Sequence, residues 1–262
     1  MSLTCKIKIH SWNGCICSKC DKTRDANHSW NGCICSKCDK TREASHCWDG
    51  CKCSKCGKIR NEYHSWKGCQ CSNCGRIKDI DGSVYKTVKI GNQKWMAENL
   101  NVEHYRNGDP IPGVQDPKQW ENLTSGAWCY YDNKQENGKN YGKLYNWYAV
   151  NDPRGLAMDG WHIPTLAELQ TLKTTVNRDG NALKAIGQGN GTNTSGFSAL
   201  LAGIRHNFNG NFEGLGGDTY FWSSTNCSPG SAFYFYLYRT DRYMHIYNIK
   251  ECYGSSIRCV QD

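Results

Sequence analysis

Phe221–Val260 reads FWSSTNCSPGSAFYFYLYRTDRYMHIYNIKECYGSSIRCV, and this segment decides the fold. Its middle alternates apolar and polar aromatic residues with a period of two, which is typical of a half-buried β-strand. The polar residues 239–242 interrupt the alternation, which resumes at Tyr243. We therefore predict an antiparallel hairpin that turns at these four residues.

One register of this hairpin sorts both of its faces. The apolar face pairs Leu237 with Met244 and Phe235 with Ile246. The other face pairs tyrosines with one another or with a histidine: Tyr238 with Tyr243, Tyr236 with His245, and Tyr234 with Tyr247. Because a slip of one residue would exchange the faces, the agreement of both faces supports the register.

The tyrosine-rich face is predicted to bind a protein or glycan ligand. Tyrosine offers a large, rigid contact area at low entropic cost, and small polar residues adapt around it. The alternative is that these aromatic residues pack under a loop or in an oligomer interface. The predicted ligand-binding residues are Asn226, Ser228, Tyr234, Tyr236, Tyr238, Thr240, Asp241, Tyr243, His245, Tyr247, Asn248 and Tyr253.

Cysteine and charge are both concentrated in the first third of the chain. Fourteen of the 18 cysteines lie between Cys5 and Cys74. Residues 1–78 carry 15 Lys and Arg against 6 Asp and Glu, whereas the remainder carries 17 against 18. We therefore predict two parts, a tandem Cys/His repeat region over 1–77 and a second domain over 78–262.

An 18-residue unit occurs four times in the first part, with the frame H-x-W-x-G-C-x-C-x-x-C. Such a short unit buries too little apolar surface to fold without a metal or a disulfide. A Cys-x-x-Cys with a histidine at a fixed offset is typical of zinc sites, and disulfides would not require the histidine to recur. We therefore predict about four structural zinc ions.

Two ligand registers fit this spacing. Across repeats, Cys17 and Cys20 would join His28 and Cys33, which gives three complete sites and suits the geometry of Cys-x-Cys. Within a repeat, the histidine and its three cysteines form a complete set, and counting favours this register. Its ligands are His10, Cys15, Cys17, Cys20, His28, Cys33, Cys35, Cys38, His46, Cys51, Cys53, Cys56, His64, Cys69, Cys71 and Cys74.

The second domain carries two helix signals. Thr165 with Glu168 three residues later forms a capping box ahead of Leu166, Leu169 and Leu172. Residues 142–150 are expected to form a shorter helix. Gly91–Asn92 is expected to form a turn between two strands.

Several segments of residues 79–262 occur in a characteristic order: DIDGSVYKTVKIGNQKWMAENLN, GAWCYYDN, YGKLYNWYAVN, GWHIPTLAELQTL, SGFSALLAGIR, YFWSST and SIRCV. This order resembles the Fibrobacter succinogenes major paralogous domain family. The resemblance implies an α+β, C-type lectin-like fold with two helices, a small sheet and termini close together. Family members often carry a cysteine before GWHIPT. Here Leu156–Met158 takes its place, so Cys259 is expected to lack a disulfide partner.

The same resemblance bears on chemistry. The EPN, QPD and WND motifs of calcium-dependent lectins are absent, so no calcium-dependent sugar site is expected. The paired reactive cysteines of the related formylglycine-generating enzymes are not reproduced either, and His162, His206 and His245 are isolated candidates for catalysis. We therefore expect a protein that is not an enzyme, with an enzyme of the formylglycine-generating type as the less favoured alternative.

Domains of this family are known as variable proteins of diversity-generating retroelements, and the position of the tyrosine-rich segment resembles their variable region. The repeats are expected to act as a docking or homo-oligomerisation module. The alternative is nucleic-acid binding, since Arg24, Arg42 and Arg60 recur at one offset. No segment has the length of a membrane span, so no membrane partner is expected. A cytoplasmic location is predicted, with a phage particle as the alternative.

Overall fold

The computed structural model describes residues 62–262 continuously, together with 12–13, 16–17, 28, 30–31, 34–40, 48–54 and 56–60 of the repeats. It divides into two compact units. The repeat unit comprises Met1–Lys67 and Cys71–Cys74, and the larger unit comprises Gly68–Gln70 and Gly75–Asp262. Each unit is described by itself below.

The repeat unit is built from very short hairpins. The strands are β1 (Trp12–Asn13), β2 (Ile16–Cys17), β3 (Trp30–Asn31), β4 (Ile34–Cys35), β5 (Trp48–Asp49), β6 (Lys52–Cys53) and β7 (Trp66–Lys67), with β8 (Gln70–Cys71) at the boundary. In the first three hairpins the tryptophan pairs with the second cysteine of the shared frame, as Trp48 does with Cys53. Gly50 begins the β5–β6 turn with a φ of 56°, a conformation that favours glycine and explains the fixed glycine of the frame.

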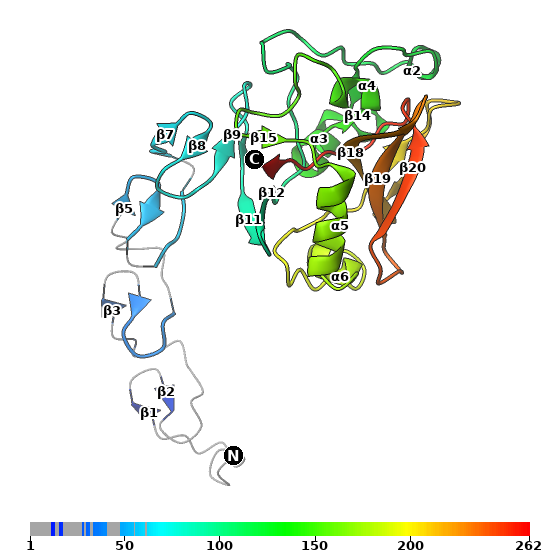
Figure 1. The fold of residues 1–262 in the computed structure, drawn as a ribbon. Helices are drawn as coiled ribbons and strands as arrows, with labels where there is room; N and C mark the ends of the chain where they lie inside the picture. The colour runs from blue at the N-terminus through cyan, green and yellow to red at the C-terminus, as the bar shows by residue number, and fades with distance from the viewer. Residues whose placement is uncertain are drawn as a thin grey trace. The chain divides into compact units, whose positions relative to one another are not determined.

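The predicted hairpin lies in a five-stranded sheet of the larger unit (Figure 1). Its strands are β16 (Ala202–Arg205), β17 (Phe212–Leu215), β18 (Asp218–Ser228), β19 (Ser231–Tyr238) and β20 (His245–Lys250), in the order β17-β16-β18-β19-β20. Only β16 and β18 pair in parallel in this sheet. The structure confirms the pairs Tyr234 with Tyr247, Phe235 with Ile246 and Tyr236 with His245.

The turn end of the hairpin differs from the prediction. Tyr243 bridges to Asp179 instead of Tyr238, and the backbone N–H of Met244 donates to Arg178. The cause is the buried ammonium group of Lys184, which donates to the carbonyl oxygens of Tyr238 at 2.7 Å and Asp241 at 2.8 Å. Because these carbonyl groups turn toward Lys184, the ladder between β19 and β20 ends early.

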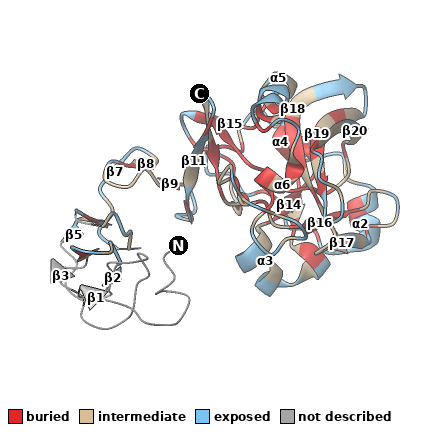
Figure 2. Ribbon diagram, turned by 90° about the horizontal axis from the view of Figure 1, so that it is seen from below, coloured by how far each residue is buried: buried red, intermediate tan, exposed pale blue. Residues whose placement is uncertain are grey.

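The apolar face of the sheet forms one of the cores of the larger unit. Phe235, Leu237 and Met244 are buried there. Helix α5 (Leu166–Thr175) packs against β18 and β19, and its predicted capping box at Thr165 is confirmed. Figure 2 shows that buried residues gather around β18, β19 and α4 (Trp147–Val150).

A second sheet of the larger unit contains its last strand. It comprises β11 (Thr87–Ile90), β12 (Gln93–Met96), β15 (Trp161–His162) and β21 (Val260–Gln261), in the order β11-β12-β21-β15. The predicted turn at Gly91–Asn92 joins β11 to β12. Trp95 pairs with Val260, so an early strand and the last strand of the unit are neighbours.

The remaining elements are short. They are β9 (Ile77–Lys78), β10 (Val84–Tyr85), β13 (Trp128–Cys129), β14 (Leu144–Tyr145), α2 (Pro117–Glu121), α3 (Gln135–Tyr141), α6 (Gly180–Leu183) and a 3-10 turn at Tyr131–Asn133. The helix expected over 142–150 is confined to α4. Its first residues instead form β14, which pairs with β13, and Asn146 caps the shortened helix by accepting from the N–H of Ala149. Mixed sheets with a few helices make this an α+β fold.

Arg258 fastens the C-terminal segment inside the larger unit. Its fully buried guanidinium group donates to Asn99 Oδ1 at 2.7 Å and to the carbonyl oxygens of Phe197 and Ser198. The next residue, Cys259, carries a buried thiol. No helix in the described part of the chain combines the length and apolar character that a membrane crossing requires.

Candidate ligand groove and metal centre

A groove of approximately 440 Å³ opens on the tyrosine-rich side of the five-stranded sheet. We call it the tyrosine groove. Five residues other than tyrosine line it: Ile204, His206, Glu213, Asp218 and Ile249. Its six tyrosines are Tyr220, Tyr234, Tyr236, Tyr238, Tyr247 and Tyr253.

Tyr236 lies at the centre of the aromatic side chains. Its ring stacks on Tyr220 at 5.8 Å between ring centroids and on His245 at 4.9 Å, and it meets Tyr238 edge-on at 5.0 Å. Such contacts stabilise one arrangement of the rings before any ligand arrives. The tyrosine groove is therefore a rigid, amphipathic surface.

The tyrosine groove also carries negative charge. Asp218 accepts a hydrogen bond from the Tyr220 hydroxyl at 3.4 Å through Oδ2, while its buried Oδ1 has no hydrogen-bond partner among the described residues. Burial raises the pKa of the Asp218 carboxyl to about 6. Among the residues that the structure describes, no lysine or arginine lines the groove. The site therefore favours a ligand that brings hydrogen-bond donors or a positive charge.

The two carboxylates of the tyrosine groove, Glu213 and Asp218, were not among the predicted ligand-binding residues. His206 has a carboxylate partner, because its Nε2 lies 2.7 Å from Glu213 Oε2. The antiparallel pairing of β16 with β17 brings the two residues together, since Ile204 lies opposite Glu213. The loop Asn209–Gly210 between two apolar stretches was the signal for this hairpin.

The predicted ligand-binding residues divide into two groups. Tyr234, Tyr236, Tyr238, Tyr247 and Tyr253 line the tyrosine groove. The others lie outside its lining. Asn226 and Ser228 lie toward the far end of β18, where Asn226 donates to Glu251. Thr240, Asp241 and Tyr243 lie at the turn of the hairpin. The ring of His245 stacks on Tyr236, and Asn248 is exposed on β20.

His162, the third isolated histidine, has a local role beside helix α5. Its Nε2 lies 2.8 Å from Glu168, the capping-box residue, and its Nδ1 lies 2.5 Å from Asp262. Burial opposes the charged ring, but hydrogen bonds to Asp262 and Glu168 outweigh it and raise the pKa of His162. These contacts connect the C-terminal residue to the start of the helix.

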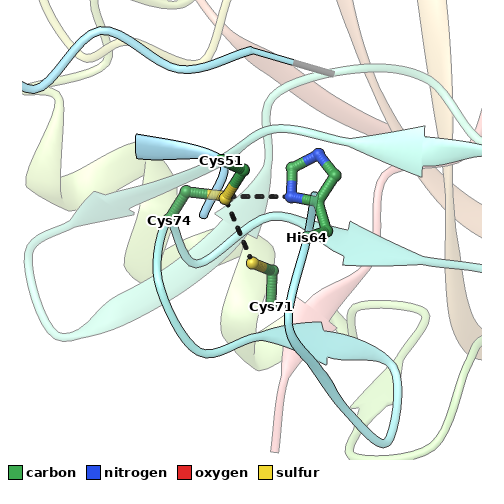
Figure 3. Close-up of side chains that lie close together, drawn as sticks. All are labelled: Cys51, His64, Cys71 and Cys74. Atoms are coloured by element: carbon green, nitrogen blue, oxygen red, sulfur yellow. Dashed lines mark hydrogen bonds between the residues drawn. The ribbon is translucent and has the colours of Figure 1, made fainter. Parts of the chain in front are cut away.

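A cluster of four metal-ligating side chains lies in the repeat unit (Figure 3). Cys51, His64, Cys71 and Cys74 place one donor atom each within 4.8 Å of one another. The sulfurs of Cys51 and Cys71 are 3.5 Å apart, and Cys74 Sγ lies 3.4 Å from His64 Nδ1. Ligands around a tetrahedral zinc ion are separated by about 3.5–3.8 Å. These four residues could therefore hold a metal ion such as zinc.

The second repeat contains the corresponding partial cluster. His28, Cys35 and Cys38 approach one another within the same limit, with Cys38 Sγ 3.4 Å from His28 Nδ1. These residues occupy the same repeat positions as His64, Cys71 and Cys74. The predicted ligands His10, Cys15, Cys20, Cys33 and His46 lie outside the described residues, and only the backbone of Cys17 is described.

The observed grouping differs from both predicted registers. Cys51 comes from the third repeat, whereas its three partners come from the fourth. Cys69, which both registers made a metal ligand, lies in the larger unit, where its thiol donates to the carbonyl oxygen of Asp159 at 3.1 Å. The physical reason is local, because Cys69 falls in the turn before β8 and Cys71 falls in the strand itself. Cys53 and Cys56 belong to neither group of described residues.

The thiols of this cluster differ in acidity. Burial, together with the neighbouring Cys74 and Cys71, raises the pKa of Cys51 to about 12. Burial also opposes ionisation of Cys71, but hydrogen bonds from His64 and from the backbone of Cys74 and Asn73 outweigh it and lower its pKa to about 6. A bound cation favours the thiolate form of every cysteine ligand.

Comparison with known protein families identifies the larger part of the chain. The model of the Fibrobacter succinogenes major domain matches residues 88–261, which is more than half of the chain, and the chain belongs to this family. The matched range contains the tyrosine groove and leaves out the repeats. No curated protein and no solved structure matches the chain.

Proposed function

We propose that this chain is a non-catalytic ligand-binding protein. A C-type lectin-like scaffold presents the tyrosine groove to a protein or glycan ligand, and zinc-binding repeats act as a docking or oligomerisation module. The observation that carries the proposal is the groove itself, which combines six tyrosines with two carboxylates on a sheet face. Surfaces of this composition bind through side chains and need no bound ion.

The chemistry of the tyrosine groove supports a ligand with several polar groups. The stacked rings around Tyr236 offer flat apolar contact, and the phenol groups both donate and accept hydrogen bonds. Glu213 and Asp218 add acceptors at one side. The hydroxyl groups of a sugar could exchange hydrogen bonds with the phenol groups, and the cationic side chains of a basic peptide would be attracted to the ring faces.

The division of the β19–β20 hairpin into a buried face and an accessible face supports retroelement diversification. Phe235 and Leu237 are fully buried, whereas Tyr238 is 39% and Tyr247 is 58% exposed. Substitution of the exposed residues would change recognition and leave the core intact. The expected genetic mark is a nearby reverse transcriptase gene and a near-identical copy of the segment that differs at adenines.

The experiment is a binding screen of the full chain on arrays of glycans and of peptides. We expect a ligand whose binding is lost in the double variant Tyr238→Ser/Tyr247→Ser. The fold should be retained because both rings are exposed, and the loss of their contacts with Tyr236 should lower the melting temperature only modestly. Tyr63→Ser, which changes an exposed tyrosine of the repeat unit, is the matched control. A ligand bound equally by wild type and double variant would contradict the proposed site.

A further inference from the structure

The four-residue metal cluster combines residues of two different repeats. Cys51 is the first cysteine of the shared frame in the third repeat, while His64, Cys71 and Cys74 are the histidine and the last two cysteines of the fourth. We propose that every complete metal site of the repeats is built in this way, with one cysteine supplied by the preceding repeat. The inference rests on the metal binding proposed above.

The geometry at Cys51 carries the proposal. Cys51 is 20 residues before Cys71 in the chain, yet their sulfurs are 3.5 Å apart, and both side chains are fully buried. A buried sulfur among two other sulfurs and an imidazole has the surroundings of a ligand. The resulting donor set of three cysteines and one histidine is a usual one for structural zinc.

The repeat spacing extends the same arrangement along the chain. His28 and Cys38 are separated by 10 residues, as are His64 and Cys74, and each pair is 3.4 Å apart. In the sequence, Cys15 precedes Cys35, and Cys33 precedes Cys53, by the 20 residues that separate Cys51 from Cys71. Sequence spacing therefore assigns three complete sets: Cys15, His28, Cys35 and Cys38; Cys33, His46, Cys53 and Cys56; and Cys51, His64, Cys71 and Cys74.

The proposed arrangement leaves some residues without a complete site at each end of the repeat array. Cys69 is the first cysteine of the last repeat, and no further repeat follows to use it. Its thiol accordingly donates to the Asp159 carbonyl oxygen within the larger unit. At the other end, the first repeat supplies His10, Cys17 and Cys20, and Cys5 is the cysteine that precedes His10.

Metal ions bound in this way would join consecutive repeats. A single repeat in isolation would lack one ligand of its own metal site. It would also carry a cysteine that belongs to the site of the next repeat. Stability would then depend mainly on the contacts between neighbours, as it does in other repeat arrays. Loss of one ion would weaken two repeats.

The test counts the zinc ions that the full chain keeps against a chelator that wild type withstands, by native mass spectrometry. We expect Cys71→Ser to lose one ion and Cys69→Ser to lose none. Loss of an ion from Cys69→Ser would overturn the proposal, because both alternative registers make Cys69 a ligand. Wild type without bound metal would overturn the proposed zinc binding as well, so the two failures are distinguishable.

Two double variants test whether the ligands are shared. Cys51→Ser/Cys71→Ser changes one site in the proposed arrangement, so it should lose one ion, as Cys71→Ser does. Cys51→Ser/Cys53→Ser is the matched control, since it changes two sites and should lose two ions. The opposite result, two ions lost by the first pair and one by the second, would show that each repeat uses its own cysteines.

Discussion

The ring of Tyr236 lies flat against the imidazole of His245, with centroids 4.9 Å apart and planes inclined by 13°. The two residues are also cross-strand partners in the ladder between β19 and β20. On its other side, His245 Nε2 lies 2.7 Å from Asp241 Oδ2. The histidine therefore connects the centre of the tyrosine groove to the turn of the hairpin.

Replacement of His245 tests this connection. His245→Ala should lower the free energy of unfolding by about 1 kcal/mol, because a stacked aromatic pair is lost from the sheet. Urea denaturation of the full chain measures the change. Asn248→Ala, at an exposed position of the same strand, should be close to neutral. Equal stability of His245→Ala and wild type would show that the stack contributes nothing.

Asp218 should make stability depend on pH. Its folded pKa of about 6 lies above the usual value near 3.8, so the neutral carboxyl group is favoured by folding. The stabilisation is present below pH 3.8 and is lost as the pH rises through 6. Asp218→Asn should therefore melt at a higher temperature than wild type at pH 8, and the advantage should shrink toward pH 4.

Calorimetry at the two pH values gives the comparison for Asp218. Glu136→Gln, which changes an exposed carboxylate of α3 outside the tyrosine groove, is the control and should leave the pH profile unchanged. A constant difference between Asp218→Asn and wild type at all pH values would exclude a titrating Asp218 as its cause.

Like Asp218, His162 should stabilise the folded protein at low pH, and this stabilisation should be lost at a higher pH than that of Asp218. Its pKa is raised in the folded protein above the ordinary 6.5, so its stabilisation is complete below pH 6.5 and declines as the pH rises through the folded pKa. His162→Gln should therefore cost more stability at pH 6 than at pH 9. Thermal melts at both values measure this, and a larger loss at pH 9 would contradict the assignment.

Substitution of Arg258 should destabilise the protein more than the loss of His245 or His162. Arg258→Met leaves the buried Asn99 side chain and the carbonyl oxygens of Phe197 and Ser198 without their donor. We expect a loss of about 3–5 kcal/mol in the free energy of unfolding, which urea denaturation measures. The exposed Arg239→Met is the control, and similar losses in the two variants would show that burial of Arg258 is unimportant.

The central pairing of the hairpin could be predicted from sequence because both of its faces impose the same register. Tyr236 opposite His245 follows from alternation alone. The turn end could not be predicted, because the cause lies outside the hairpin. Lys184 is distant in sequence, and its ammonium group reorganises the carbonyl groups of Tyr238 and Asp241.

The sites were only partly visible in the sequence for a related reason. The repeat frame indicates which residue types could bind a metal, but repeats with the same frame give no sign of which copies would share an ion. Our proposed assignment depends on the contact of Cys51 with Cys71, which the frame alone does not predict. Likewise, the tyrosines could be identified by alternation, whereas Asp218 and Glu213 join them through strand pairings between β16, β17 and β18.

The pairing of Trp95 with Val260 has a consequence for how this domain can be combined with others. The family-matched range 88–261 starts in β11 and ends in β21, two strands of the same small sheet, while the tyrosine groove is built on a different sheet. Fusion at one end, or insertion of the whole domain into a loop of a host protein, would therefore leave the tyrosine groove undisturbed. We therefore expect this domain to tolerate fusion to different partner domains.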